Sequence, residues 1–158
     1  MALPGEVASL IVSGGVPQPA GVDLTASEVF RLSSALKLMR DGKELPEYEP
    51  VEARDGFWFL EPGAYKVRFG EVVKVPERAV GLCFPRSSLI RSGVLVACGV
   101  WDPGYVGRGE ALLAVLNPHG FVLEVGTPIP QIVFFGLWGS TRRKYEGSYQ
   151  GEGVWWVR

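Results

Sequence analysis

Ala64-Tyr-Lys-Val-Arg-Phe69 alternates apolar side chains with the charged side chains of Lys66 and Arg68. Such a period of two places the apolar residues on one face of a β-strand and the charged residues on the other, whereas an amphipathic helix needs a period near 3.6. The segment therefore predicts a strand with one buried and one solvated face.

Short apolar runs separated by Gly and Pro continue from this strand toward the C-terminus. They are Val72–Val75, Ala79–Phe84, Val94–Trp101, Leu112–Leu116, Phe121–Val125 and Ile132–Trp138. Asn117–Gly120 has the composition of a tight turn, so the two runs on either side of it are expected to pair as a hairpin. Many short strands at near-regular spacing favour a barrel or sandwich. We expect one mainly β domain over residues 1–158.

The segments before Gly63 are less regular. Leu3–Val12 is expected to be helical, and Thr25–Met39 is a second candidate because Thr25 and Glu28 have capping-box spacing. Residues 22–24 and 29–32 also fit an extended chain, so both alternatives remain for that segment. Asp41–Arg54 is charged and contains prolines, which indicates a surface excursion.

Composition excludes several classes of protein. The 158 residues carry a formal net charge of -1, which gives no basic field for nucleic acid or an anionic membrane. The start of the chain lacks the pattern of a signal peptide, and no uncharged run is long enough to span a bilayer. A cytoplasmic protein is expected. Cys83 and Cys98, the two cysteines, are interpreted as reduced core residues.

Pro85-Arg86-Ser87-Ser88-Leu89-Ile90-Arg91 places two arginines and two hydroxyls after a strand. Guanidinium groups pair with phosphate oxygens and hydroxyls donate to them, so the segment is a candidate anion site. The alternative is a helix N-terminus with solvated arginines.

Trp101-Asp102-Pro103-Gly104-Tyr105 places a carboxylate and an aromatic ring around a turn. Asp102 either caps that turn or orients a water molecule, with Tyr105 as a wall for a sugar or base. No metal-ligand spacing, Ser-His-Asp set or Walker-type loop is present. These absences favour water attack assisted by a carboxylate, with any metal arriving on the phosphates of the substrate.

Five segments in order resemble the motifs of the dUTPase and dCTP deaminase superfamily, and archaeal dUTPases most of all. They are Pro19–Leu24, Pro85–Leu89, Val100–Tyr105, Gly126–Phe134 and Tyr149–Gly151. The resemblance implies a homotrimer of distorted jelly-roll β-barrels with active sites between subunits. It also departs from the family pattern: residues 128–131 read Pro-Ile-Pro-Gln, which lacks an expected charge.

The resemblance implies roles for individual residues. It assigns triphosphate binding to Arg86, Ser87, Ser88 and Gln131, with Arg91 in the same segment. Asp102 would be the catalytic carboxylate and Tyr105 the ring against deoxyribose. Asp23 would hold Mg²⁺ on the triphosphate through water. The tail from residue 139 to 158, with Tyr149 and Gln150, would close over the nucleotide.

Two activities are compatible with this superfamily. For members that deaminate dCTP, the resemblance implies a catalytic Glu three residues before the Asn that ends the strand after the Asp-Pro-Gly motif. Counted back from Asn117, that position is Ala114 here. Glu110 lies in the same strand, but a register shift would be needed to bring it there. Hydrolysis of dUTP to dUMP and pyrophosphate is therefore the expected activity. A dCTP deaminase, with or without dUTPase activity, and a non-catalytic nucleotide-binding regulatory trimer are the alternatives.

Overall fold

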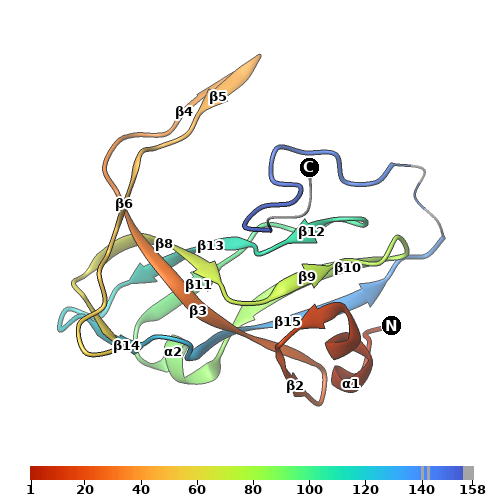
Figure 1. The fold of residues 1–158 in the computed structure, drawn as a ribbon, viewed down its shortest axis with the longest axis horizontal. Helices are drawn as coiled ribbons and strands as arrows, with labels where there is room; N and C mark the ends of the chain where they lie inside the picture. Colours follow the sequence, from red (N-terminus) through yellow and green to blue (C-terminus); the bar gives the residue numbers. More distant parts are fainter. Residues whose placement is uncertain (140, 142, 155–158) are drawn as a thin grey trace.

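The computed structural model describes residues 1–139, 141 and 143–154 (Figure 1). Its helices are α1 (Gly5–Ala8), the 3-10 turn η1 (Ser9–Ile11) and α2 (Ser87–Arg91). Its strands are β1 (Val12–Ser13), β2 (Val16–Gln18), β3 (Gly21–Leu32), β4 (Lys37–Met39), β5 (Gly42–Glu44), β6 (Tyr48–Pro50), β7 (Phe57–Leu60), β8 (Gly63–Phe69), β9 (Val72–Lys74), β10 (Ala79–Pro85), β11 (Val94–Ala97), β12 (Val106–Gly107), β13 (Glu110–Val115), β14 (Phe121–Glu124) and β15 (Pro128–Gly136).

The main sheet follows the order β10-β15-β3-β8-β13-β11, with β2 and β6 added to β3. Its two ends meet, because the backbone of Gly81 in β10 exchanges hydrogen bonds of 2.9 and 3.0 Å with that of Trp101, just beyond β11. Closing a sheet on itself removes exposed edges. The expected mainly β, nearly closed barrel is confirmed, and Asp102 directly follows the point of closure.

The barrel interior is filled by alternating residues of the central strands. In β8 the side chains of Tyr65, Val67 and Phe69 are buried, as the alternation predicts, while Lys66 and Arg68 face outward and are partly exposed. Phe69 and Phe134 of β15 are among the largest fully buried side chains. Burial of apolar surface on this scale is the main stabilising contribution to such a fold.

The helical alternative for Thr25–Met39 is wrong, since residues 21–32 form the long strand β3. The capping-box residues take other partners. The backbone N–H and the hydroxyl of Thr25 donate to the Glu71 carboxylate at 2.8 Å, and Glu28 pairs with Arg68 at 3.0 Å. Pairing with β15 and β8 on either side fixes the extended form.

The expected hairpin around Asn117–Gly120 is also wrong. The turn exists, with the Gly120 N–H donating to the Asn117 carbonyl at 3.0 Å. The strands beyond it separate, however: β13 pairs with β8 and β11, while β14 pairs with β7. Turn composition does not specify which strand a segment joins, and β7 was absent from the sequence prediction.

Other segments follow the sequence predictions in part. The N-terminal helix exists as α1 and η1, shorter than Leu3–Val12. Strands β4 and β5 form a hairpin arm that projects from the barrel (Figure 1). The arm begins before Asp41, and the surface excursion expected over Asp41–Arg54 is exposed at most positions. Within the described ranges, no helix has the length and apolar character to cross a bilayer.

Candidate active site

The predicted site residues fall into two groups in one chain. The first, which we call the Arg86 cluster, consists of Asp23, Arg86 and Gln131 together with Gln18, which was not predicted, and Ser87 and Ser88 lie beside it. Asp23 in β3 lies opposite Gln131 in β15, and Arg86 directly follows β10, the other neighbour of β15. Pairing of adjacent strands thus brings three separate motifs together.

Asp23 is the centre of this cluster and is buried. Its Oδ2 accepts a hydrogen bond of 3.1 Å from Gln18 Nε2 and lies 3.7 Å from Arg86 Nη1. Burial raises the pKa of Asp23, while the Arg86 charge and hydrogen bonds from Gln131 and Gln18 oppose that rise. The carboxylate is already partnered by the protein, which fits a water-mediated role toward a cation better than direct coordination.

Residues 128–131, whose sequence differs from the family pattern, form an irregular part of strand β15. The pairing of β15 with β3 shifts register between Pro128 and Gln131, as a β-bulge does. Proline lacks a backbone donor and is tolerated at bulges. The Ile129 carbonyl inside the bulge accepts the Arg86 N–H at 3.0 Å. The bulge therefore holds the start of the arginine segment against β15.

The segment after Arg86 forms the short helix α2. Arg86 is its N-cap residue without a side-chain cap, and Ser87, Ser88 and Arg91 are exposed. The Arg86 side chain is 44% exposed and reaches toward Asp23. The segment is thus a helix N-terminus with exposed hydroxyls and arginines, and its role as an anion site stays a prediction.

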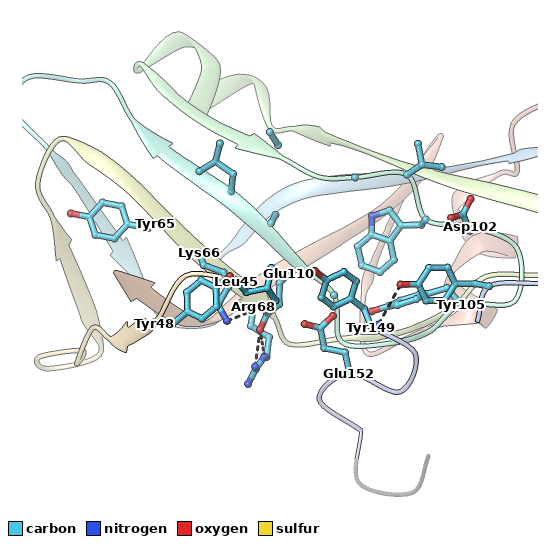
Figure 2. A pocket seen from close by; sticks show the side chains of 18 of the residues that line it. Leu45, Tyr48, Tyr65, Lys66, Arg68, Asp102, Tyr105, Glu110, Tyr149 and Glu152 are labelled. Atoms are coloured by element: carbon cyan, nitrogen blue, oxygen red, sulfur yellow. Dashed lines mark hydrogen bonds and ion pairs between the residues drawn. The ribbon is translucent and has the colours of Figure 1, made fainter. Parts of the chain in front are cut away.

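The second group lines a cavity of about 750 Å³, which we call the Asp102 pocket. Figure 2 shows Asp102 at one end and Tyr48, Lys66 and Arg68 at the other, with Tyr105 and the tail between them. The walls come from β8, β13 and the loop after β11, and the tail contributes Tyr145, Tyr149 and Glu152.

Asp102 lies in a backbone turn in which the Tyr105 N–H donates to the Asp102 carbonyl at 3.1 Å. Gly104 takes a φ of 84°, a left-handed conformation that glycine adopts most readily. The Asp102 side chain is exposed, and its carboxylate forms no side-chain hydrogen bond or ion pair with the parts of the chain that are described. The Asp102 carboxylate therefore does not cap the turn with a hydrogen bond.

Tyr105 is buried, unlike an open wall for a sugar. Its ring packs edge-on against Trp101 at 5.3 Å and Tyr145 at 5.5 Å between centroids. The phenol oxygen has no hydrogen-bond partner within residues 1–139, 141 and 143–154. Burial, with the nearby charges of Glu152 and Glu110, raises the pKa of Tyr105. The Tyr145 side chain of the tail therefore covers one edge of the Tyr105 ring.

Charged residues form the far end of the pocket. Glu110 Oε2 lies 2.9 Å from Lys66 Nζ, and Glu110 Oε1 lies 2.7 Å from an Arg68 Nη atom. The tail brings Glu152 to the same place, where burial and the Glu110 carboxylate raise its pKa to about 7. Glu110 is therefore not a solvated residue at a strand start, because its side chain is only 17% exposed and its carboxylate is held by two cations.

The tail docks on the Asp102 loop through Gln150. Its Nε2 donates to the Gly104 carbonyl at 3.0 Å, and its Oε1 accepts the Val106 N–H at 3.1 Å. Tyr149 lines the pocket and accepts a hydrogen bond of 2.8 Å from Lys43 of the arm. Trp155 and Trp156 of the tail lie outside the described residues.

The Arg86 cluster and the Asp102 pocket of one chain are far apart. Trp101 lies opposite Gly81, and Arg86 is five residues further along the same strand. At about 3.3 Å per residue, this separates Arg86 from the Asp102 loop by roughly 16 Å. Hydrogen-bond contacts need about 3 Å, so Arg86 and Asp102 of one chain do not contact each other.

Sequence reasoning missed several residues of both groups. Lys66 and Arg68 were recognised as outward-facing, but nothing in the sequence placed them with the tail residue Glu152 in one pocket. Gln18 gave no signal, because it reaches Asp23 only through the pairing of β2 with β3. Alternating charges on a strand next to a candidate site are the one sequence feature that could have indicated the pocket.

Comparison with known proteins identifies the family. The family profile described as dCTP deaminase-like matches residues 9–137. The chain belongs to the dCTP deaminase-like family. A relative from Aeropyrum pernix, named "Probable deoxyuridine 5'-triphosphate nucleotidohydrolase", is 49% identical over 142 residues, which cover 90% of this chain and 89% of the relative. A relative of the same name from Archaeoglobus fulgidus is 41% identical over 140 residues, covering 87% and 82%.

Two solved structures share the fold of this chain. The 2'-deoxycytidine 5'-triphosphate deaminase from Agrobacterium tumefaciens superposes with a TM-score of 0.62 at 19% identity, covering 84% of this chain and 47% of the deaminase. A dUTPase from Staphylococcus bacteriophage 80alpha, the G164S mutant with dUpNHpp, gives 0.51 at 17% identity, covering 82% and 78%. At these identities the similarity concerns the fold alone.

Proposed function

We propose that this protein is a dUTP nucleotidohydrolase that converts dUTP to dUMP and pyrophosphate. The observation that carries the proposal is the 49% identity to a relative named for that activity, over nearly the full length of both chains. The chemistry of the site agrees, since an exposed carboxylate in a pocket and a separate group of phosphate donors are the parts that water attack on a triphosphate needs.

Strand β13 favours hydrolysis over deamination. Ala114, at the position inferred for the deaminase glutamate, is paired with Leu95 on one side and Ala64 on the other. Glu110 lies four residues away, about 13 Å along the strand, and is opposite Arg68 in that register. Moving it to Ala114 would break its bonds to Lys66 and Arg68, so Glu110 is a poor substitute.

The site is proposed to be shared between copies of this chain in a homotrimer. Because Arg86 and Asp102 of one chain are too far apart, Arg86, Ser87, Ser88 and Gln131 of one copy would meet Asp102 of its neighbour. Cyclic trimers repeat such a head-to-tail contact three times, which gives three equivalent sites. One domain with a closing tail, residues 139–158, would form each subunit.

In the proposed reaction the Asp102 carboxylate orients a water molecule and accepts its proton as the water attacks the α-phosphorus. Arg86, the two serines and Gln131 bind the phosphates and stabilise the charge that develops on pyrophosphate. Tyr105 lies beside the sugar and leaves little room for a 2′-hydroxyl. Tyr149, Gln150 and the rest of the tail exclude bulk water.

Mg²⁺ fits this scheme as a companion of the substrate. The described residues contain no group of three or more His, Cys, Asp or Glu side chains that could hold a metal ion. Asp23 would contact the ion through water, with Arg91 near the outer phosphates. When bound, Mg²⁺ would neutralise phosphate charge. Asp102 would still activate the water, and Arg86, the two serines and Gln131 would still bind the phosphates.

One assay separates the candidate functions. Purified protein with Mg²⁺ is incubated with dUTP, dCTP or UTP, and pyrophosphate and ammonia are measured separately. The proposal predicts pyrophosphate from dUTP, little from UTP, and no ammonia from dCTP. Ammonia from dCTP at a comparable rate would identify a deaminase, and binding without either product would identify a regulatory protein.

A further inference from the structure

The hairpin arm formed by β4 and β5 is tied to the barrel by backbone pairing. At its base β3 pairs with β6, and beyond that pair the Ser33 N–H donates to the Glu47 carbonyl at 3.0 Å. Nearer the tip β4 pairs with β5, where Leu38 lies opposite Lys43. Paired strands at the base and at the tip set the direction in which the arm projects from the barrel.

The two faces of the arm differ in how their lysines are partnered. Residues directly opposite in an antiparallel pair share a face, and neighbours along a strand alternate between faces. Lys37 and Glu44 are opposite each other and form an ion pair at 3.1 Å on one face. Lys43 is on the other face, and within the described ranges it has no carboxylate at ion-pair distance. Lys37 is thus neutralised inside the arm, whereas the Lys43 charge is directed elsewhere.

Lys43 contacts the tail instead. Its Nζ donates to the Tyr149 hydroxyl at 2.8 Å and lies 4.4 Å from the centre of the Tyr149 ring. Among the residues that the structure describes, this is the only side-chain hydrogen bond between the arm and another part of the chain. An ammonium group is attracted both to the hydroxyl and to the face of an aromatic ring, so the contact fixes the place of the Tyr149 side chain.

Both sides of this contact border the Asp102 pocket. Leu45, two residues beyond Lys43, lines the pocket from the arm, and Tyr149 lines it from the tail (Figure 2). The next tail residue, Gln150, is bound to the Asp102 loop by its two hydrogen bonds. The tail is therefore held at two adjacent residues, once by the loop and once by the arm.

We propose that the arm positions the tail over the Asp102 pocket and that Lys43 is the positioning residue, acting through Tyr149. For the reaction, this role rests on the proposed function, whereas the contact itself can be measured without substrate. Lys43 touches no reacting atom in the proposed reaction. Its loss should therefore change how firmly the tail is docked and leave the chemical step unaltered.

The expected effect of losing the contact is modest, because Lys43 and Tyr149 are both exposed to solvent. An exposed cation–π contact and a hydrogen bond each stabilise only weakly, which corresponds to a change of about 3- to 10-fold in the docking equilibrium. Gln150 keeps its own hydrogen bonds to the loop. Docking of the tail should therefore be weakened and not abolished.

Hydrogen exchange in the free full-length protein measures docking, because the Gly151 amide donates to the Val106 carbonyl when the tail is docked. At one pH, protection of this amide should fall about 3- to 10-fold in Lys43→Ala. Lys43→Arg should keep it within about twofold, since a guanidinium also donates and lies over aromatic rings. Lys37→Ala, on the opposite face of the arm, is the matched control and should not change it. Equal protection in Lys43→Ala and the wild-type protein would overturn the proposal.

A double-variant cycle tests whether Lys43 acts through Tyr149. Tyr149→Ala should lower the protection of the Gly151 amide, and adding Lys43→Ala to that variant should lower it no further. Independent, additive losses in the combined variant would contradict the assignment of Tyr149 as the partner of Lys43.

Steady-state kinetics connects the contact to the reaction. In Lys43→Ala the KM for dUTP should rise about 3- to 10-fold and kcat should stay within about twofold of the wild-type value, because the reacting groups remain in place. A fall in kcat with an unchanged KM would contradict the positioning role. If the wild-type protein releases no pyrophosphate from dUTP, the proposed function fails, and the hydrogen-exchange comparison alone decides whether Lys43 positions the tail.

Discussion

The Arg86 cluster and the Asp102 pocket are assembled in different ways. Asp23 of the cluster is fixed by paired strands, is buried, and is partnered by Gln18 and Arg86. Asp102 follows the barrel closure in an irregular loop and is exposed, and the tail docks on that loop mainly through backbone contacts and Gln150. Under the proposed function, strand pairing prepares the phosphate-binding group in advance, while the carboxylate proposed to react lies in a loop whose surroundings depend on the docked tail.

The largest effect is expected on the turnover of dUTP when Asp102 is substituted. Asp102→Asn keeps the shape of the side chain but removes its basicity, so turnover of dUTP should fall about 10²- to 10⁴-fold. The dissociation constant for dUTP should stay unchanged or improve, because a negative charge near the triphosphate is lost. Steady-state kinetics and equilibrium binding measure the two quantities. Asp41→Asn on the exposed arm is the control, and near-normal turnover in Asp102→Asn would mean that Asp102 has no catalytic role.

Weaker binding of dUTP is expected when the Arg86 cluster is changed. Arg86→Ala removes a charge-assisted phosphate contact and also the cation beside Asp23, so the dissociation constant of dUTP should rise about 10- to 150-fold. Arg54→Ala, an exposed arginine far from both regions in the sequence, should leave binding unchanged. Calorimetric titration with a non-hydrolysable dUTP analogue measures the dissociation constant of each variant. Equal affinities for the two variants would show that the Arg86 cluster does not bind the nucleotide.

Docking of the tail should depend on pH through Glu152. Its pKa of about 7 in the docked tail lies above the ordinary 4.5, because burial and Glu110 favour the protonated form against the opposing charges of Arg68 and Lys66. The contribution to docking is therefore complete below pH 4.5 and is lost as the pH rises to about 7.

Hydrogen exchange at the Gly151 amide, which donates to the Val106 carbonyl at 2.8 Å, reports on this docking. After correction for intrinsic rates, its protection should decrease between pH 5 and 7.5 in the wild-type protein. Glu152→Gln should flatten this dependence, and Glu146→Gln, an exposed change in the same tail, should not. Protection that rises with pH would refute the role of Glu152.

The smallest effect is expected at Tyr105. Because its hydroxyl has no partner in the described structure, Tyr105→Phe leaves no other buried group unpaired. The unfolding temperature should change by no more than a few degrees, in the upward direction. Tyr105→Ala, which empties a packed aromatic site, is the contrasting variant and should lower it clearly. A large loss of stability in Tyr105→Phe would show that the hydroxyl is bonded after all.

The sequence predicted the alternating strand at Tyr65, Val67 and Phe69 because a period of two is a local property. It could not decide the structure of Thr25–Met39, where local capping signals compete with pairing to distant strands, and it assigned the wrong partner to Phe121–Glu124. The motif residues of the site were recognisable one segment at a time. That Asp23 meets Arg86, while Asp102 lies apart from both, depends on strand order and barrel closure, which no local pattern encodes.

The central claim is that Asp102 of one copy acts together with Arg86 of another, and mixed oligomers test it most directly. Asp102→Asn and Arg86→Ala proteins, each nearly inactive alone at a dUTP concentration well below the wild-type KM, are unfolded together, refolded at equal ratio and assayed at that concentration for pyrophosphate release. If sites are shared between copies, about a quarter of them regain both intact residues, so about a quarter of wild-type activity should return. If each chain supplies both residues of its own site, mixing restores no activity, and the shared-site account is contradicted.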